Sequence, residues 1–220
     1  MKRRQTSDGD CSAIERTVEL RRPLILFAPG AGAPSTSAWM RAWARRLGRI
    51  GEVVRFDYRY MKEGRRAPDR LPSLVAAHRA ALQRARAAHP RRPVVLAGKS
   101  MGSRIGCHLS LEAPVDALVC FGYPLVSTSG ALRDQVLLAL QTPVLFIQGT
   151  ADRLCPLQLL EATRRQMKAA SRIHLVENGD HSLLVRPRAH AAAGPSQAQV
   201  DGAILDSIRA FLDEHAPGAS

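Results

Sequence analysis

A serine, an aspartate and a histidine occur in an order and at positions that could carry out acyl transfer. Ser100 is the centre of Gly98-Lys99-Ser100-Met101-Gly102, a Gly-x-Ser-x-Gly pattern between an apolar run and a helix-like stretch. That layout is typical of a nucleophile elbow, a sharp turn that exposes the serine hydroxyl above the end of a strand. Side chains at the two glycine positions would crowd the turn and the strand and helix beside it. The pattern therefore predicts Ser100 as a nucleophile.

A serine hydroxyl is a weak nucleophile near neutral pH, so it needs a base to take its proton and a carboxylate to orient that base. In open parallel sheets, functional groups gather at the carboxyl ends of the strands. Asp152 follows the apolar run 144–149, and His181 follows the run 173–176. The sequence thus predicts His181 as the base and Asp152 as the acid that orients it.

Other acids and histidines were weighed for these two roles. Asp152 could instead cap the helix that follows Pro156, but that helix is expected to begin too late for this. Asp57 ends an earlier strand and is the reserve acid, whereas Asp180 is adjacent to His181 in sequence and points its side chain elsewhere. The other histidines are expected on helices, within a strand or in another loop: His78, His89, His108, His174, His190 and His215.

Acyl transfer also needs hydrogen-bond donors for the oxyanion that develops on the substrate. One predicted donor is the backbone N–H of Met101, directly after the nucleophile. The other is expected from the small-residue loop after the apolar run 24–28, with Ala31 as first choice and Gly32 as second. Small residues in this loop would let the backbone approach a substrate closely.

A substrate pocket is expected from aromatic and apolar residues close to the elbow. Phe121, Tyr123 and Leu125 follow the end of a strand that should neighbour the elbow strand. Trp39 is a further candidate for substrate contact. Because Trp39 and Trp43 are one helical turn apart, core packing is the favoured interpretation for both.

A phosphate-binding loop competes for the same residues, because Gly98-Lys99-Ser100 could end a Gly-x-x-x-x-Gly-Lys-Ser motif. That motif needs a glycine at position 93, where the chain has Pro93. Residues 94–97 would have to form a flexible cradle, yet they have the pattern of a buried strand. We therefore reject a nucleotide site here, and Lys99 is expected to point into solvent or to pack its stem over the sheet edge.

Composition excludes several other classes of site. None of the four cysteines forms a Cys-x-x-Cys pair, so the sequence predicts no metal and no cofactor, and Cys107 and Cys120 are expected as buried small hydrophobes. No apolar run approaches the ~20 residues of a membrane span. The polar N-terminus, residues 1–8, has no apolar stretch after it, so we expect a cytoplasmic protein.

The formal net charge of +13 raises the question of nucleic-acid binding. Lysine occurs at only four positions, and the arginines come as dispersed pairs rather than as one basic block. Aromatic residues that could stack on bases are not interleaved with them. We therefore expect no dedicated nucleic-acid site.

Strand-like and helix-like segments alternate along the chain, which favours a mostly parallel sheet with helices on both faces. We expect one domain at 12–216 after a disordered segment at 1–11, with a short edge strand at 17–20, an arginine-rich loop at 59–70, a short helix within 131–140 and a loop at 186–196. The main strands are expected at 23–28, 53–58, 94–97, 117–122, 143–149 and 172–176, and the main helices at 38–49, 71–89, 103–112, 157–170 and 197–215.

Four motifs together resemble the α/β-hydrolase superfamily: Pro29-Gly30-Ala31-Gly32, Gly98-Lys99-Ser100-Met101-Gly102-Ser103-Arg104, Gln148-Gly149-Thr150-Ala151-Asp152 and Gly179-Asp180-His181-Ser182. More narrowly, residues 23–215 resemble the small lidless group related to dienelactone hydrolase and to the testis-expressed and NSL-complex-subunit hydrolase-like proteins. The resemblance implies the fold and a catalytic triad of Ser100, Asp152 and His181. It departs from the usual pattern at Pro29, where a histidine is expected, and at Lys99.

These observations lead to three hypotheses. The first is a serine hydrolase that cleaves small carboxylic esters or thioesters through an acyl-enzyme. The short connection at 122–131 leaves no room for a substantial lid, which favours short or soluble acyl groups. The second is a non-catalytic α/β-hydrolase scaffold that binds a protein partner, and the third is nucleic-acid binding through the positive surface.

Overall fold

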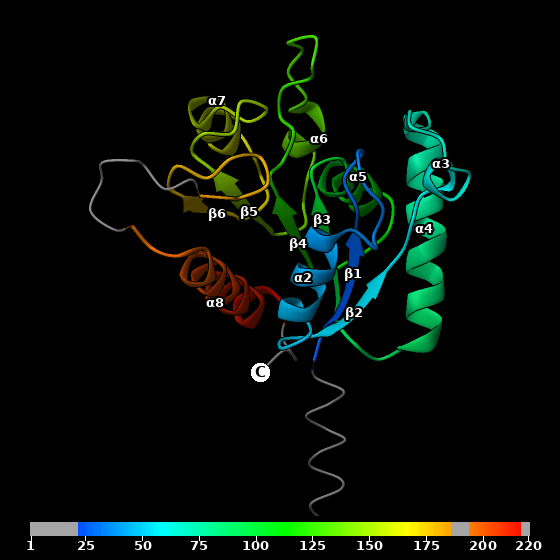
Figure 1. Ribbon diagram of the computed structural model, residues 1–220. Coiled ribbons are helices and arrows are strands. Elements are labelled where there is room, and N and C mark those ends of the chain that lie inside the picture. Colours follow the sequence, from blue (N-terminus) through cyan, green and yellow to red (C-terminus); the bar gives the residue numbers. More distant parts are fainter. Residues whose placement is uncertain (1–21, 186–193, 217–220) are drawn as a thin grey trace, which may run out of the picture.

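Six parallel strands form one sheet in the order β2-β1-β3-β4-β5-β6 (Figure 1). The structure is a computed structural model that describes residues 22–185 and 194–216, so the expected disordered segment at 1–11, the strand at 17–20 and most of the loop at 186–196 lie outside it. The strands are β1 (Leu24–Ala28), β2 (Glu52–Arg55), β3 (Val94–Lys99), β4 (Ala117–Phe121), β5 (Val144–Gly149) and β6 (Ser171–Val176).

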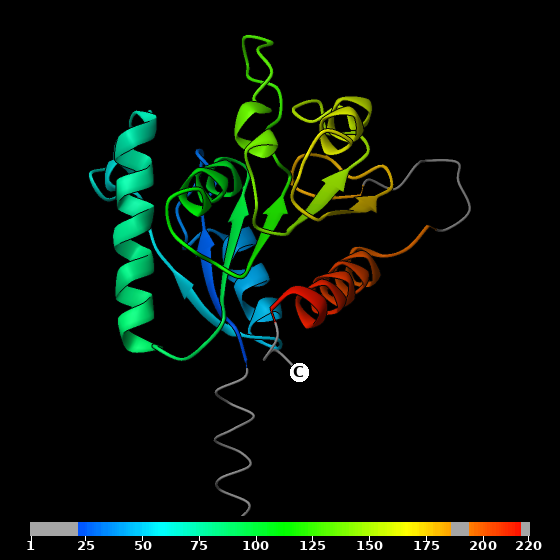
Figure 2. The same cartoon turned by 180° about the vertical axis from the view of Figure 1, so that it is seen from behind.

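Helices cover both faces of this sheet, as the alternation of segments predicts (Figures 1 and 2). One face carries the first and last helices of the described chain, and the other carries the rest. The helices are α2 (Ala38–Leu47), α3 (Arg59–Lys62), α4 (Leu71–Ala88), α5 (Met101–Ser110), α6 (Gln135–Leu138), α7 (Leu157–Arg164) and α8 (Gln197–His215).

The apolar runs of the central strands are continuous because both of their faces are covered. In β1, Ile25 and Phe27 belong to the core under α2 and α8, whereas Leu24 and Leu26 belong to the core under α4 and α5. This split follows from the two-residue period of a strand. All five residues of β1 are buried.

Two elements differ from the sequence-based boundaries by three residues or more. The strand expected to reach Tyr58 ends at Arg55, and the loop expected after it contains α3. The chain turns there because the carbonyl of Tyr58 accepts hydrogen bonds from the N–H groups of Met61 and Lys62. The helix expected to reach residue 170 ends at Arg164.

The turn between β3 and α5 is packed so closely that two positions have no room for a side chain. A Cβ atom on Gly98 would lie 2.3 Å from the backbone nitrogen of Ser103, and one on Gly102 would lie 2.5 Å from the carbonyl oxygen of Ala28. Real Cβ contacts are not this short, so both positions require glycine. The glycines therefore let α5 leave the sheet directly against the end of β1.

This packing predicts that Gly102→Ala is strongly destabilising. The added methyl group must push backbone away from backbone, and such overpacking costs about 3 kcal/mol. Urea unfolding followed by circular dichroism measures the loss in free energy of unfolding.

Gly202→Ala is the matched control, because Gly202 is an exposed residue of α8 and a Cβ there meets nothing within 4 Å. Removing a glycine from a helix interior stabilises by about 0.5–1 kcal/mol. A Gly102→Ala protein as stable as the wild type would contradict the packing described for the turn.

Candidate active site

The loops that follow three of the strands meet at the carboxyl edge of the sheet. Ser100 follows β3, Asp152 follows β5, and His181 follows β6 (Figure 1). The strands are parallel and in level register, so their carboxyl ends lie along one edge. The sheet thus brings together residues that are 29 and 81 positions from His181 in the sequence.

Ser100 has a backbone conformation that non-glycine residues rarely adopt, with φ of 50° and ψ of −115°. Such a strained residue persists only where its surroundings hold it. Its N–H donates to the carbonyl of Phe121 at 2.8 Å, and its carbonyl accepts a hydrogen bond from the hydroxyl of Ser103 at 2.6 Å. These contacts fix the turn in the form of a nucleophile elbow.

A chain of short hydrogen bonds links the three side chains. The Oγ of Ser100 lies 2.8 Å from Nε2 of His181, and Nδ1 of His181 lies 2.8 Å from Oδ2 of Asp152. The imidazole is 29% exposed, whereas the carboxylate is fully buried. A ring in this position can accept the serine proton on one nitrogen while the carboxylate holds the N–H on the other.

Asp152 is held as a carboxylate by the groups around it. Burial favours the neutral acid and raises its pKa, but hydrogen bonds from His181, Gln148 and the N–H of Leu154 outweigh burial and leave the pKa below its usual value. Asp152 therefore carries its charge at neutral pH and does not cap α7, whose first turn begins after Pro156.

Gln148 is a contact that the sequence analysis did not single out. Its Nε2 donates to Oδ2 of Asp152 at 2.7 Å, on the same oxygen that contacts the histidine. The side chain is completely buried. An amide at the end of an otherwise apolar strand, four residues before the acid, was the available signal. Asp57, the reserve acid, lies elsewhere and accepts a hydrogen bond from the N–H of Ser35 at 2.6 Å.

The loop after β1 contacts the elbow through Gly30. A Cβ on Gly30 would lie 3.6 Å from Cβ of Ser100, whereas a Cβ on Gly32 would meet nothing within 4 Å. The carbonyl of Ala31 accepts a hydrogen bond from the hydroxyl of Tyr60 at 2.8 Å, which orients the next peptide. The loop glycine that lies beside Ser100 is therefore Gly30 rather than Gly32.

Three of the residues expected to line a substrate pocket are fully buried. Phe121, Tyr123 and Leu125 have no exposed area in this conformation. Tyr123 directs its hydroxyl to the carbonyl of Arg133 at 3.3 Å. These three residues support the site from behind, and their role in substrate binding remains a prediction.

Trp39 is partly buried, and its indole Nε1 donates to the carbonyl of Ser182 at 2.9 Å. Its ring also packs against Phe27, Phe121 and Trp43, with centroid distances of 5.7–6.2 Å. Trp39 thus joins α2 to the turn that carries the histidine.

Lys99 does not extend into solvent. Its Nζ donates to the carbonyl oxygen of His181 and lies 5.1 Å from the centroid of the Trp39 ring. Burial lowers the pKa of Lys99 to about 8, although the negative charges of Asp152 and Asp180 favour its ammonium form. The residue before Ser100 is therefore in contact with the chain segment that carries His181.

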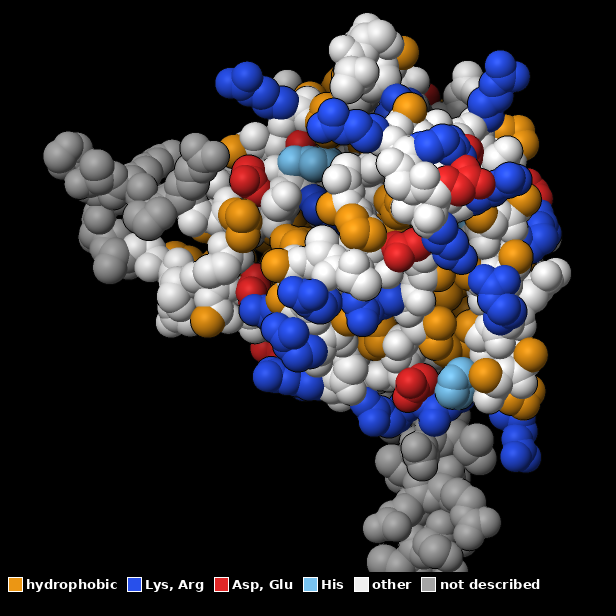
Figure 3. All heavy atoms as spheres, turned by 45° about the vertical axis from the view of Figure 1, so that its right-hand side comes forward, with side chains coloured by type: hydrophobic (Ala, Val, Ile, Leu, Met, Phe, Trp, Pro, Cys, Tyr) orange, Lys and Arg blue, Asp and Glu red, His pale blue; other side chains and the backbone are white. Residues whose placement is uncertain are grey.

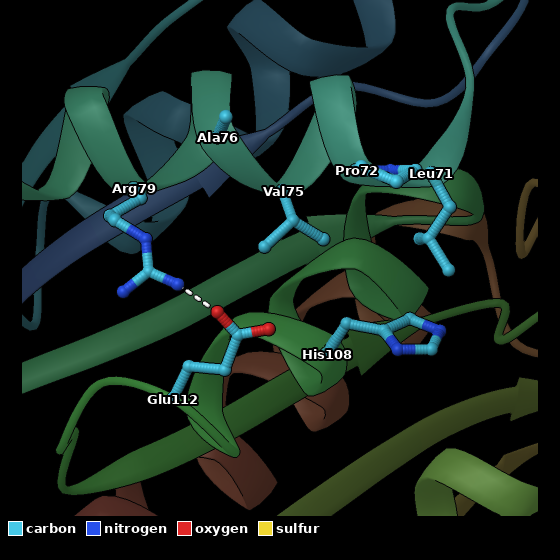
Figure 4. Close-up of a pocket in the computed structure, with 7 residues that line it drawn as sticks. All are labelled: Leu71, Pro72, Val75, Ala76, Arg79, His108 and Glu112. Carbon is cyan, nitrogen blue, oxygen red and sulfur yellow. Dashed lines mark hydrogen bonds and ion pairs between the residues drawn. The ribbon is translucent and has the colours of Figure 1, made fainter.

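A separate cavity of about 370 Å³ lies between α4 and α5, about two helical turns along α5 from Ser100 (Figure 4). Arg79 and Glu112 point toward each other across its edge and form an ion pair. Its lining residues are Leu71, Pro72, Val75, Ala76, Arg79, His108 and Glu112. None of them is among the residues of the Ser100 site.

Basic side chains are spread over the molecular face shown in Figure 3, with acidic ones among them. Some form ion pairs, including Arg59 with Glu63 at 2.6 Å and Arg65 with Asp69 at 2.7 Å. The absence of a dedicated nucleic-acid site stays a prediction from the sequence.

Residues 22–185 and 194–216 contain neither a membrane-spanning helix nor a cluster of metal-binding side chains. None of the helices there has the length and apolar character needed to cross a bilayer. The same part of the chain contains no group of three or more His, Cys, Asp or Glu side chains that could hold a metal ion.

A family model described as "Alpha/beta hydrolase domain" matches residues 21–212. Solved structures with a similar fold include an α/β serine hydrolase homologue from Coxiella burnetii, which is 20% identical with a TM-score of 0.62 over 73% of this chain and 77% of that one. A dienelactone hydrolase from Anabaena variabilis is 17% identical, with a TM-score of 0.66 over 88% and 87% of the two chains.

A third similar structure is an a/b serine hydrolase without a lid from Xanthomonas campestris. It is 17% identical, with a TM-score of 0.66 over 89% of this chain and 84% of that one. Here too, the connection from β4 to α6 holds one isolated bridge, between Val126 and Leu132, and no helix covers the site among the described residues. At these identities the likeness shows the fold.

The buried lysine predicts a specific pH dependence of stability. The folded-state pKa of about 8 lies below the ordinary 10.5, so between these values the unfolded chain binds more protons and stability rises with pH. In Lys99→Met this contribution, at most about 3 kcal/mol, is absent. Urea unfolding from pH 8 to 10.5 should therefore show the wild type gaining stability relative to Lys99→Met.

Lys168→Met, which changes an exposed lysine, should follow the wild type across the same range. A constant difference in free energy between wild type and Lys99→Met would show that the lysine is not buried as described.

Proposed function

The chain belongs to the alpha/beta hydrolase domain family, and from that premise we propose that it is a serine hydrolase of small carboxylic esters or thioesters. The observation that carries the proposal is the continuous hydrogen-bond chain from Ser100 through His181 to Asp152. A serine hydroxyl with a base and a buried carboxylate behind it is the arrangement that acyl transfer requires.

In the proposed reaction, Oγ of Ser100 attacks the substrate carbonyl while Nε2 of His181 takes the hydroxyl proton. The charge of Asp152 stabilises the imidazolium that forms. The imidazolium then gives its proton to the leaving alcohol or thiol, which leaves an acyl-enzyme on Ser100. Water, activated by the same histidine, releases the carboxylic acid and restores the serine.

We propose the backbone N–H groups of Met101 and Ala31 as the donors to the oxyanion, with Gly32 as the second choice in the loop. Met101 begins α5, and the first N–H groups of a helix have no partner within it. Among the described residues, the N–H of Ala31 donates to no other backbone group, and Gly30 brings that peptide next to Ser100. Loss of one such donor typically costs ~10²–10³ in rate.

The proposed substrate class follows from the open access to Ser100. Because the described residues form no helical lid, little apolar surface is available to a long acyl chain, so short or soluble acyl groups are favoured. Esterases and a dienelactone hydrolase among the similar folds act on acyl compounds, which supports the class of reaction.

Covalent labelling with a fluorophosphonate probe tests the nucleophile. We expect the folded wild type to be labelled and Ser100→Ala to be unlabelled, because the probe phosphonylates an activated serine. Asp152→Asn should label about 10²- to 10⁴-fold more slowly, since the amide favours the wrong histidine tautomer. Intact-protein mass spectrometry measures the extent and rate of labelling.

Asp57→Asn is the matched control, because it neutralises an acid at another strand end that does not contact the histidine. It should label at the wild-type rate. Labelling of Ser100→Ala to the wild-type extent, or none on the folded wild type, would reject the proposal and favour a non-catalytic scaffold.

Acyl-chain preference tests the substrate class separately. With p-nitrophenyl esters, kcat/KM should be at least about tenfold higher for acetyl to butyryl chains than for decanoyl, because a lidless site cannot bury the added methylenes. Steady-state hydrolysis across the series measures this. A preference for decanoyl would assign the protein to lipid-like substrates instead.

A further inference from the structure

The turn that carries His181 is braced internally by Asp180. Its Oδ1 accepts hydrogen bonds from the N–H groups of Ser182 at 2.7 Å and Leu184 at 3.0 Å. Leu183 adopts φ of 62°, a left-handed backbone conformation that is typical of a tight turn. These bonds shape the turn but do not fix its distance from the elbow.

Two side chains from other elements provide that fixed distance. Nζ of Lys99 donates to the carbonyl of His181, and Nε1 of Trp39 donates to the next carbonyl, that of Ser182, at 2.9 Å. Nζ of Lys99 also lies 5.1 Å from the centre of the Trp39 ring, so the two side chains contact each other. We call this pair of side chains the carbonyl clamp.

Gly122 also packs closely against the turn that carries His181. A Cβ on Gly122 would lie 2.7 Å from the carbonyl oxygen of His181 and 3.4 Å from its Nδ1. The backbone of His181 is therefore packed between Gly122 and the clamp.

The lysine occupies this position at an electrostatic cost. The side chain of Lys99 is partly buried, and its Nζ forms no ion pair with a carboxylate among the described residues. Burial lowers its pKa to about 8, and both the ammonium and the amine retain N–H donors, so the bond to His181 survives loss of the proton. A costly buried lysine beside a nucleophile is better explained by a function than by stability.

We propose that Lys99 is a positioning residue that, with Trp39, holds the carbonyls of His181 and Ser182 and so keeps Nε2 of the histidine at hydrogen-bond distance from Ser100. Because Lys99 directly precedes Ser100, its hydrogen bond ties the turn that carries the base to the chain segment that carries the nucleophile. This inference rests on the proposed function, in which His181 is the base.

The test compares Lys99→Met, Lys99→Arg and Trp39→Phe with the wild type by the kinetics of fluorophosphonate labelling. Lys99→Met keeps the apolar stem and loses the donor, so the maximal labelling rate should fall about 10- to 100-fold while half-saturation by the probe changes little. Lys99→Arg retains a donor and should recover part of the rate. Trp39→Phe keeps an aromatic ring but loses the indole N–H together with part of the ring's packing, and it should show a smaller fall of the same kind.

Lys168→Met, on an exposed lysine, is the matched control and should label as the wild type does. A wild-type labelling rate for folded Lys99→Met, or no recovery in Lys99→Arg, would overturn the inference. If Lys99→Met fails to fold, Trp39→Phe decides, and an unchanged rate there overturns it.

Amide hydrogen exchange separates this inference from the proposed function. Deuterium uptake of residues 181–184 should accelerate in Lys99→Met and Trp39→Phe, while uptake in β1 and β3 stays as in the wild type. This readout needs no activity, so an unlabelled wild type would reject the hydrolase and still leave the clamp tested. Unchanged uptake at 181–184 would reject the clamp.

Discussion

The contact of backbone against backbone at the β3–α5 turn is the constraint on which the site depends. Gly102 lies so close to the end of β1 that no side chain fits, and Gly98 lies equally close to the first turn of α5. This packing holds Ser100 at φ of 50° and leaves its hydroxyl at the carboxyl edge of the sheet. The other functional groups are arranged around that fixed point.

The parallel sheet provides the second condition. Its level register brings the ends of β3, β5 and β6 to one edge, so loops distant in sequence deliver an acid and a histidine to the same serine. Burial under helices on both faces makes this edge rigid. The hydrogen bonds of Gln148 and the Leu154 N–H then keep Asp152 charged within an otherwise apolar region.

Lys99 connects the β3–α5 turn with the turn that carries His181. Strand geometry places it beside the nucleophile, and its flexible stem reaches the histidine turn. Together with Trp39 it supplies hydrogen-bond donors to two consecutive carbonyls of that turn. Such contacts are a direct way to restrict the motion of a loop.

The parallel fold, the elbow and the three residues that meet there could be predicted from the sequence, because they depend on local patterns: apolar runs, glycine spacing and polar residues just after strands. Pro93 likewise sufficed to reject a phosphate loop. The directions of the side chains at the strand ends became apparent only in the folded protein. Lys99 turns inward, Gly30 rather than Gly32 meets the elbow, Gln148 supports Asp152, and Tyr123 is buried. The positions of Lys99 and Gly30 depend on contacts between segments far apart in the chain, which no local pattern encodes.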